Sequence, residues 1–233
     1  MNQLVFYWSG DNNQIPTWLV KSTLLTNKEV KIIQISDNKT NEINGVSNVI
    51  RVKKSEFILM DRIFGYSLID TRDNKTLFID ADTIILKKID FDKYSTGNYL
   101  FKRTESLIFD NKYNLAYPEL AHKDLLDTMP IMAGTQMIIN EENFFKELYL
   151  LKNSLSLNLK KWFGDQILLK KIFENKKEKF KFLDKSFLRI VEKEDFIKGR
   201  NLILYKENNA VTFKGNTKKY MQNMFFSIFN NNK

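Results

Sequence analysis

The stretch that decides the fold is Leu77-Phe78-Ile79-Asp80-Ala81-Asp82-Thr83-Ile84-Ile85-Leu86, in which a short apolar run leads directly into two aspartates separated by one residue. Consecutive apolar residues before a polar turn are typical of a strand buried on both faces of a sheet. In an extended backbone, residues i and i+2 point to the same side, so both carboxylates leave the carboxyl end of this strand on one face. Ligand sites of α/β folds commonly lie at that edge of the sheet.

The pair Asp80 and Asp82 predicts a cation site. Two carboxylates held this close repel one another unless a divalent metal ion lies between them and a ligand. Carboxylate oxygens suit Mn²⁺ or Mg²⁺, and these ions keep coordination positions open for the oxygens of a diphosphate. The alternative interpretation is a solvated turn in which Asp82 caps the strand end. The buried strand before the pair and the apolar run over residues 83–86 favour the cation site.

On the amino-terminal side of this stretch, short apolar segments alternate with amphipathic ones. That alternation is typical of βαβ units packed around a largely parallel sheet. We expect one helix from about Pro16 to Thr26, and a second that Ser55 caps and that ends near Ile69. The expected strands cover residues 4–8, 30–35, 49–52 and 77–79. The predicted fold class is therefore α/β, with a mostly parallel central sheet flanked by helices.

On the carboxyl-terminal side the pattern is looser. The expected strands cover residues 83–86, 98–101, 136–139 and 202–205, and the expected helices cover residues 141–151, 164–173 and 218–229. The segment 102–128 has no clean period, and it is longer than the structureless connections of most compact domains. We therefore expect it to contain short helices and a loop that covers a site.

Composition excludes several kinds of chemistry. A chain of 233 residues is long enough to bury a core as one domain without disulfides. It has no cysteine and one histidine, His122, so thiol chemistry, iron–sulfur clusters and sites rich in cysteine or histidine ligands are excluded. Catalysis must therefore rest mainly on carboxylate, amide, hydroxyl, lysine and arginine groups.

The net charge of +9 is concentrated in the last third of the chain. Residues 1–150 contain 18 Lys and Arg against 20 Asp and Glu, whereas residues 151–233 contain 19 against 8. A positive field of this kind favours an anionic partner, such as a nucleoside diphosphate, an anionic lipid or a nucleic acid. The alternative is that these lysines only form solvated helix faces.

The eight glycines are too widely spaced for a glycine-rich phosphate loop, since no two lie closer than 16 positions. A P-loop needs two glycines five apart, and a dinucleotide fingerprint needs three within six residues. Both kinds of phosphate site are therefore excluded. A cation on the two carboxylates remains as the means of holding a phosphate.

The 77–86 stretch resembles the Asp-x-Asp segment of GT-A glycosyltransferases, especially those of glycosyltransferase family 8, the family of glycogenin and of bacterial lipooligosaccharide galactosyltransferases. Three further matches follow the family's order. Arg62 lies eighteen residues before Asp80, Gly164-Asp165-Gln166 is similar to the Asp-Gln segment, and Thr212-Phe213-Lys214-Gly215-Asn216-Thr217-Lys218 resembles the His-x-x-Gly-x-x-Lys motif. The resemblance extends over residues 4–219.

The resemblance implies a role for each matched residue. Asp165 would bind the hydroxyls of the donor sugar, and the amide oxygen of Gln166 would lie near the reacting carbon, so these two are the expected catalytic residues. Asp80 and Asp82 would hold the metal ion. The residues expected to bind the donor are Tyr7, Ser9, Arg62, Asp80, Ala81, Asp82, Ala133, Gly134, Gly215 and Lys218.

Two positions depart from the family's pattern. Thr212 stands where the family has a histidine that binds the metal, and a neutral hydroxyl is a poor ligand for a divalent ion. Either Asp80 and Asp82 hold the ion with water and diphosphate, or the dependence on metal is reduced. Met132 stands where the family has an asparagine that contacts the donor sugar, which leaves the identity of that sugar open.

The resemblance implies a single GT-A domain, with a Rossmann-like nucleotide-sugar-binding half (1–90), an acceptor half (91–217) and a basic, aromatic tail (218–233). The implied activity is transfer of a hexose from a nucleotide-diphosphate sugar, by analogy a UDP-sugar, to a glycan, lipid-linked or protein acceptor, with retention of configuration. Two alternatives remain open. One is a basic module that binds nucleic acid, a partner that the enzyme interpretation does not need, and the other is a degenerate glycosyltransferase fold that serves as a non-catalytic subunit.

The termini suggest a location and two further contacts. Residues 1–5 lack the charged region and the long apolar region of a secretory signal, so we expect a cytoplasmic protein. Phe225, Phe226 and Phe229 are expected to be core residues or contacts of a homodimer. Together with Lys218 and Lys219, they also allow a peripheral contact with the inner face of a membrane.

Overall fold

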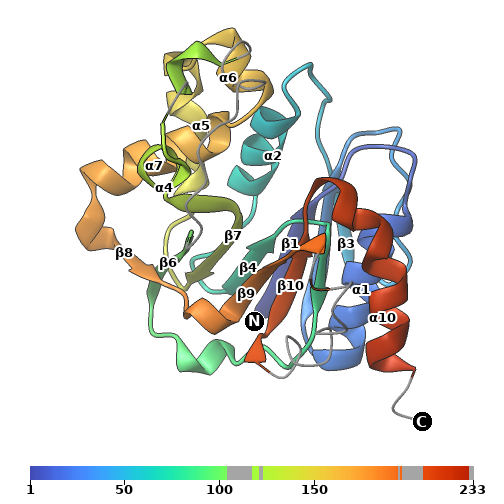
Figure 1. Ribbon diagram of the computed structural model, residues 1–233. Helices are drawn as coiled ribbons and strands as arrows, with labels where there is room; N and C mark the ends of the chain where they lie inside the picture. Colours follow the sequence, from blue (N-terminus) through green and yellow to red (C-terminus); the bar gives the residue numbers. More distant parts are fainter. Residues whose placement is uncertain (104–116, 121–122, 194, 196–206, 231–233) are drawn as a thin grey trace.

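A mixed sheet forms the centre of the molecule in a computed structural model that describes residues 1–103, 117–120, 123–193, 195 and 207–230 (Figure 1). In the described residues this sheet has seven strands in the order β3-β2-β1-β4-β7-β6-β8. The strands are β1 (Asn2–Tyr7), β2 (Lys31–Ser36), β3 (Asn48–Arg51), β4 (Lys75–Ile79), β6 (Gly97–Lys102), β7 (Ile131–Ile139) and β8 (Phe180–Phe182). A smaller sheet has the order β5-β10-β9 and consists of β5 (Thr83–Ile85), β10 (Ala210–Phe213) and β9 (Leu188–Val191).

The large sheet is mostly parallel, as predicted. The pairs β3–β2, β2–β1, β1–β4 and β6–β8 are parallel, whereas β7 is antiparallel to both β4 and β6. The carboxyl ends of β1 and β4 therefore meet at one edge of the sheet, close to the first half of β7. Thr135 of β7 is paired with Ile79, the last residue of β4.

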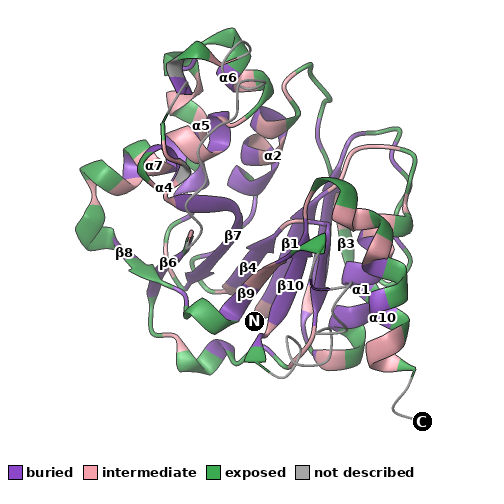
Figure 2. Cartoon of the chain, in the orientation of Figure 1, coloured by how far each residue is buried: buried purple, intermediate pink, exposed green. Residues whose placement is uncertain are grey.

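Helices cover both faces of the large sheet (Figure 1). Helices α2 (Ile58–Ser67), α5 (Phe145–Leu150) and α7 (Gly164–Asn175) pack on one face, and α1 (Gln14–Thr26) packs on the other. The alternation of side chains along β1 serves both layers, because Val5 and Tyr7 face α2 while Leu4 and Phe6 face α1. The central strands β2, β1, β4 and β7 are accordingly buried along almost all of their length, whereas the edge strand β8 is mostly exposed (Figure 2).

Shorter helices complete the described part of the chain. The α-helices among them are α4 (Leu125–Thr128) and α6 (Leu157–Lys161). The 3₁₀ helices are η1 (Phe91–Lys93), η2 (Pro118–Leu120), η3 (Leu151–Ser154), η4 (Lys177–Lys179), η5 (Lys185–Phe187) and η6 (Gly215–Tyr220). No helix within the described residues has both the length and the apolar character needed to cross a membrane.

The carboxyl-terminal segment is part of the folded core. Helix α10 (Met221–Phe229) packs against α1, where the ring of Phe225 lies 4.9 Å from that of Trp18. Met224 and Phe225 are buried, while Phe226 is 40% exposed. The boundary predicted between residues 217 and 218 falls inside η6. Residues 218–230 are therefore not a separate tail.

Several predicted elements have other bounds. Helix α2 begins at Ile58 and Ser55 does not cap it; instead Ser55 donates its backbone N–H and its hydroxyl to the carboxylate of Asp61. Strand β7 begins at Ile131, five residues before the predicted start, because its pairing with β6 continues across a shift in register, from Leu100 opposite Gln136 to Lys102 opposite Ile131. The helix predicted over residues 141–151 is shorter, since it begins at Phe145. The strand predicted over residues 202–205 and His122 lie outside the described residues.

Candidate active site

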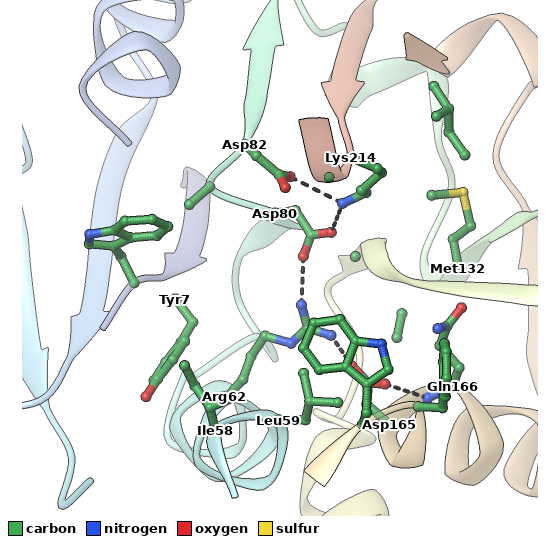
Figure 3. Close-up of a pocket in the computed structure, with 18 of the residues that line it drawn as sticks. Tyr7, Ile58, Leu59, Arg62, Asp80, Asp82, Met132, Asp165, Gln166 and Lys214 are labelled. Atoms are coloured by element: carbon green, nitrogen blue, oxygen red, sulfur yellow. Dashed lines mark hydrogen bonds and ion pairs between the residues drawn. The ribbon is translucent and has the colours of Figure 1, made fainter. Parts of the chain in front are cut away.

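A cavity of about 590 Å³ opens at the carboxyl ends of β1 and β4. Both halves of the chain contribute to its wall, and Figure 3 shows the polar side chains pointing toward one another across it. The lining residues are Tyr7, Trp8, Ser9, Ile58, Leu59, Arg62, Asp80, Ala81, Asp82, Arg103, Met132, Ala133, Gly134, Trp162, Phe163, Asp165, Gln166, Ile190, Lys214, Gly215 and Lys218. The chain thus gathers residues at the cavity that are up to 211 positions apart.

Asp80 lies between two cationic side chains. Its Oδ1 accepts a hydrogen bond of 2.6 Å from Nη1 of Arg62, and its Oδ2 forms an ion pair with Nζ of Lys214. Burial alone would raise the pKa of Asp80, but the positive charges of Lys214 and Arg62 hold that pKa well below its ordinary value. Asp80 is therefore ionised at neutral pH.

Asp82 is also paired with lysines. Its Oδ1 lies 3.1 Å from Nζ of Lys214, and its Oδ2 lies 2.9 Å from Nζ of Lys218. The pairing of β10 with β5 sets this geometry, because the backbone N–H of Phe213 donates to the carbonyl oxygen of Asp82 at 2.8 Å. Lys214 thus bridges the two carboxylates. Burial alone would lower the pKa of Lys214, but Asp80 and Asp82 raise it, so the bridge is charged.

Gly134 allows the carboxylate of Asp80 to take its position. A Cβ atom at residue 134 would lie 2.1 Å from Oδ2 of Asp80, which is far inside contact distance. The backbone of Gly134 also accepts a hydrogen bond of 2.8 Å from the N–H of Asp80. The small residues Ala133 and Gly134 therefore let β7 lie directly against the first aspartate.

The first turn of α7 forms the wall opposite Asp80. Asp165 is buried there and forms an ion pair with Nη2 of Arg62, so the same guanidinium joins Asp80 and Asp165 (Figure 3). Gln166 is bound through its amide oxygen, which accepts a hydrogen bond of 2.6 Å from Nη2 of Arg103. The oxygen expected to face the reacting carbon is therefore held by a second arginine.

Aromatic side chains line other parts of the cavity. Tyr7 ends β1, and burial raises the pKa of its hydroxyl to about 12, with Asp61 adding to the shift, so the phenol is neutral. Trp162 is half exposed and precedes α7. Ser9 also lines the cavity, and its hydroxyl donates to Oδ2 of Asp37 at 2.5 Å. These groups give the cavity an apolar side as well as a charged one.

Comparison with solved structures identifies the fold. The galactosyltransferase LgtC, in complex with donor and acceptor sugar analogues, matches with a TM-score of 0.56 and 13% identity, over 97% of this chain and 96% of its own. GlyE from Streptococcus pneumoniae TIGR4 matches with a TM-score of 0.56 and 16% identity, over 99% of this chain and 62% of its own. Mouse xyloside xylosyltransferase 1 matches with a TM-score of 0.53 and 10% identity, over 93% of this chain and 98% of its own. No model of a protein family matches the sequence, and no curated protein matches it.

The chain has a GT-A glycosyltransferase fold. The predicted resemblance to these enzymes and the predicted α/β class are confirmed at the level of the fold. All twelve residues expected to be catalytic or to bind the donor line the same cavity, so the fold brings them together. Their chemical roles remain predictions.

The residues of this GT-A site do not fit a divalent ion as they are arranged. The position between the two carboxylates is taken by the ammonium group of Lys214. Thr212 is buried, and its hydroxyl lies 3.2 Å from Oδ1 of Asp82, to which it donates. Among the described residues, no three His, Cys, Asp or Glu side chains converge in a group that could hold a metal ion.

Two cationic residues of the site were not predicted from the sequence. Lys214 lies in the segment quoted for its resemblance, but only the family's own motif positions were assigned there. Its extended backbone (φ −113°, ψ 143°) places it two residues after Thr212, on the same side of the chain, and this period-two spacing is the signal that could have found it. Arg103 follows β6 directly and carries no comparable signal in the sequence.

Proposed function

We propose that this protein is a glycosyltransferase that transfers a hexose from a nucleotide-diphosphate sugar, by analogy a UDP-sugar, to a glycan or glycolipid acceptor. The observation that carries the proposal is the composition of the cavity wall. Four cationic side chains and three carboxylates meet there, at the sheet edge where a GT-A fold has its Asp-x-Asp segment. An excess of positive charge in a partly buried cleft suits a diphosphate.

The cationic side chains would stabilise the leaving group. As the bond between the anomeric carbon and the phosphate oxygen breaks, negative charge develops on the diphosphate. Lys214 and Lys218 are fixed by ion pairs, so their positive charges need little rearrangement during the reaction. Gly215, with φ of +52° and open space beside it, would let the diphosphate approach the backbone between these two lysines.

Asp165 would orient the donor sugar. Its carboxylate is buried beside Arg62, and a buried ionised acceptor makes strong hydrogen bonds with sugar hydroxyls. Arg103 would hold Gln166 in one orientation next to the same sugar. Retention of configuration is part of the proposal by analogy with glycosyltransferase family 8.

The acceptor would bind near Trp162. The indole of this residue is 50% exposed at the cavity, and flat aromatic rings provide apolar surface for the faces of sugars. A glycan or the glycan part of a lipid would suit such a surface. Dimerisation and a peripheral membrane contact remain expectations.

Binding of nucleotides tests the proposal. We expect at least one of UDP, GDP and CDP to raise the melting temperature of the protein, and the corresponding monophosphate to raise it less. The variant Lys218→Met should reduce the diphosphate effect, because it removes one charged contact. Lys219→Met is the matched control, because Lys219 is exposed and does not line the cavity.

The outcome also separates the alternatives. A nucleic-acid-binding module would show steeply salt-dependent binding to single strands and no response to nucleoside diphosphates. A degenerate, non-catalytic subunit would bind the nucleotide and never release it from a nucleotide sugar. The absence of any nucleotide response, in the presence or absence of Mn²⁺, would contradict the proposal.

A further inference from the structure

The two carboxylates of the Asp-x-Asp segment are covered on their cavity side by lysines. The side chains of Asp80 and Asp82 are 18% and 9% exposed, whereas those of Lys214 and Lys218 are 38% and 37% exposed. Both lysines line the cavity. A phosphate that enters the cavity would therefore meet the ammonium groups before it met the carboxylates.

The charges of this arrangement match those of a metal site. Two carboxylates and one divalent cation have a net charge of zero, and so have two carboxylates and two ammonium groups. An ammonium group has three N–H donors, and the described ion pairs use two of those of Lys214 and one of those of Lys218. The remaining N–H groups can donate to phosphate oxygens. In a metal site, the bound metal ion would attract these oxygens instead.

Two residues of the segment that follows β9 in the small sheet support this arrangement. Thr212 stands where the family has a third protein ligand for the metal ion, and Lys214 lies two residues later on the same side of the chain. A metal ion would have to displace the Lys214 ammonium group from both carboxylates. It would then have two protein ligands, and water and diphosphate oxygens would have to complete its coordination.

We propose that the ammonium groups of Lys214 and Lys218 take the place of the divalent cation, so that a nucleoside diphosphate binds this protein without a metal ion. This inference rests on the proposed function, because it concerns the same donor site. Thr212 left two alternatives open: an ion held by Asp80 and Asp82 with water and diphosphate, or a reduced dependence on metal. The inference selects the second, so Mn²⁺ or Mg²⁺ has no part in donor binding.

The test compares nucleotide affinity in the presence of a chelator and in the presence of Mn²⁺, by calorimetry on the full chain. For the wild type, we expect the dissociation constants of UDP, GDP or CDP in EDTA and in Mn²⁺ to agree within about twofold. Lys214→Met, which keeps the length of the side chain and removes its charge, should weaken diphosphate binding in EDTA by about 10- to 100-fold, the effect of losing a charge-assisted hydrogen bond. Lys219→Met should change it by less than about threefold.

Each outcome decides the question. If Mn²⁺ tightens diphosphate binding to the wild type by about tenfold or more, the inference is wrong and the proposed function stands. If folded Lys214→Met binds the diphosphate in EDTA as tightly as the wild type does, the inference is also wrong. If no nucleoside diphosphate binds under any condition, both the proposed function and the inference fail. The wild-type comparison needs no variant, so it holds even where Lys214→Met does not fold.

Discussion

Asp80 can take its position beside residue 134 only because that residue, Gly134, has no side chain. The missing Cβ leaves room for the Asp80 carboxylate, which forms ion pairs with Arg62 on one side and Lys214 on the other. At the scale of single residues, the site is therefore set by contacts that tolerate little change in volume. Both residues were predicted to bind the donor, but the contact between them depends on the antiparallel pairing of β7 with β4.

We expect Gly134→Ala to disrupt the site more than it disrupts the fold. The added methyl group would push the Asp80 carboxylate away from Lys214, at a cost of about 1–3 kcal/mol in the free energy of unfolding and at least about tenfold in diphosphate affinity. Urea denaturation and calorimetry measure the two effects. In an Asp80→Ala background the same substitution should cost much less, and an equal cost in both backgrounds would contradict the proposed clash.

The carboxylate of Asp37 makes the stability of the folded protein depend on pH. Its carboxylate is buried and, although burial opposes this, hydrogen bonds from Ser9, Lys39 and Thr40 lower its pKa from 3.8 to about 2. A group whose pKa is lower in the folded state stabilises that state fully above the unfolded value, and this contribution is lost as the pH falls through the folded value. Asp37 therefore stabilises the fold above about pH 4 and loses that effect toward pH 2.

The variant Asp37→Asn tests the direction of this pH dependence. The difference in unfolding free energy between wild type and variant should be constant above about pH 4 and should shrink by roughly 1–2 kcal/mol toward pH 2, with solvent screening included. Urea denaturation at a series of pH values measures it. A difference that grows on acidification would show that Asp37 is not held in its ionised form.

At the scale of elements, η6 and α10 connect the cavity to the core. Lys218 lies in η6, and α10 follows it directly and packs against α1 through Trp18 and Phe225. The aromatic residues at the end of the chain thus fix the segment that carries a cationic site residue. This arrangement explains why a segment that is basic first and aromatic later is folded against the domain.

Two substitutions on α10 test the importance of this packing. Phe225 is 5% exposed, so Phe225→Ala should lower the unfolding free energy by about 3 kcal/mol or more. Phe226→Ala on the neighbouring position, where the ring is 40% exposed, should cost less than about 1 kcal/mol. Chemical denaturation measures both. Both rings contact Trp18, so equal costs would show that the burial of Phe225 does not decide how strongly α10 is held.

The elements differ in how well the sequence predicts them, for physical reasons. Strands β1, β2 and β4 are buried on both faces, and their continuous apolar runs mark them within two residues. The start of α2 was misjudged, because Ser55 has the chemistry of a cap but uses its hydroxyl to bind Asp61. The early start of β7 could not be predicted, since it depends on pairing with β6, which is distant in the sequence.

The residues of the site also differ in how well the sequence predicts them. The positions of Asp80, Asp165 and Lys218 followed from motifs in a known order, because the fold fixes where these motifs meet. Arg103 and the bridge made by Lys214 were missed because they depend on which side chains meet across strands. A motif predicts where a residue lies, whereas its partner is decided by the three-dimensional arrangement.

On the scale of the whole molecule, the two predicted halves are not separate bodies. Strands β6, β7 and β8 from the second half continue the large sheet, and β5 from the first half pairs with β10. Arg62 from the first half binds Asp165 from the second. The cavity between them therefore exists only in the complete fold.

The most direct measurement is the release of nucleoside diphosphate from UDP-, GDP- and CDP-sugars by the purified protein, because slow transfer to water needs no known acceptor. We expect release from at least one donor, at the same rate in EDTA as in Mn²⁺. Asp165→Asn should lower this rate by about 100-fold or more while the protein still binds the free diphosphate. A protein that releases no diphosphate from any of these donors, or an Asp165→Asn variant as active as the wild type, would contradict the account.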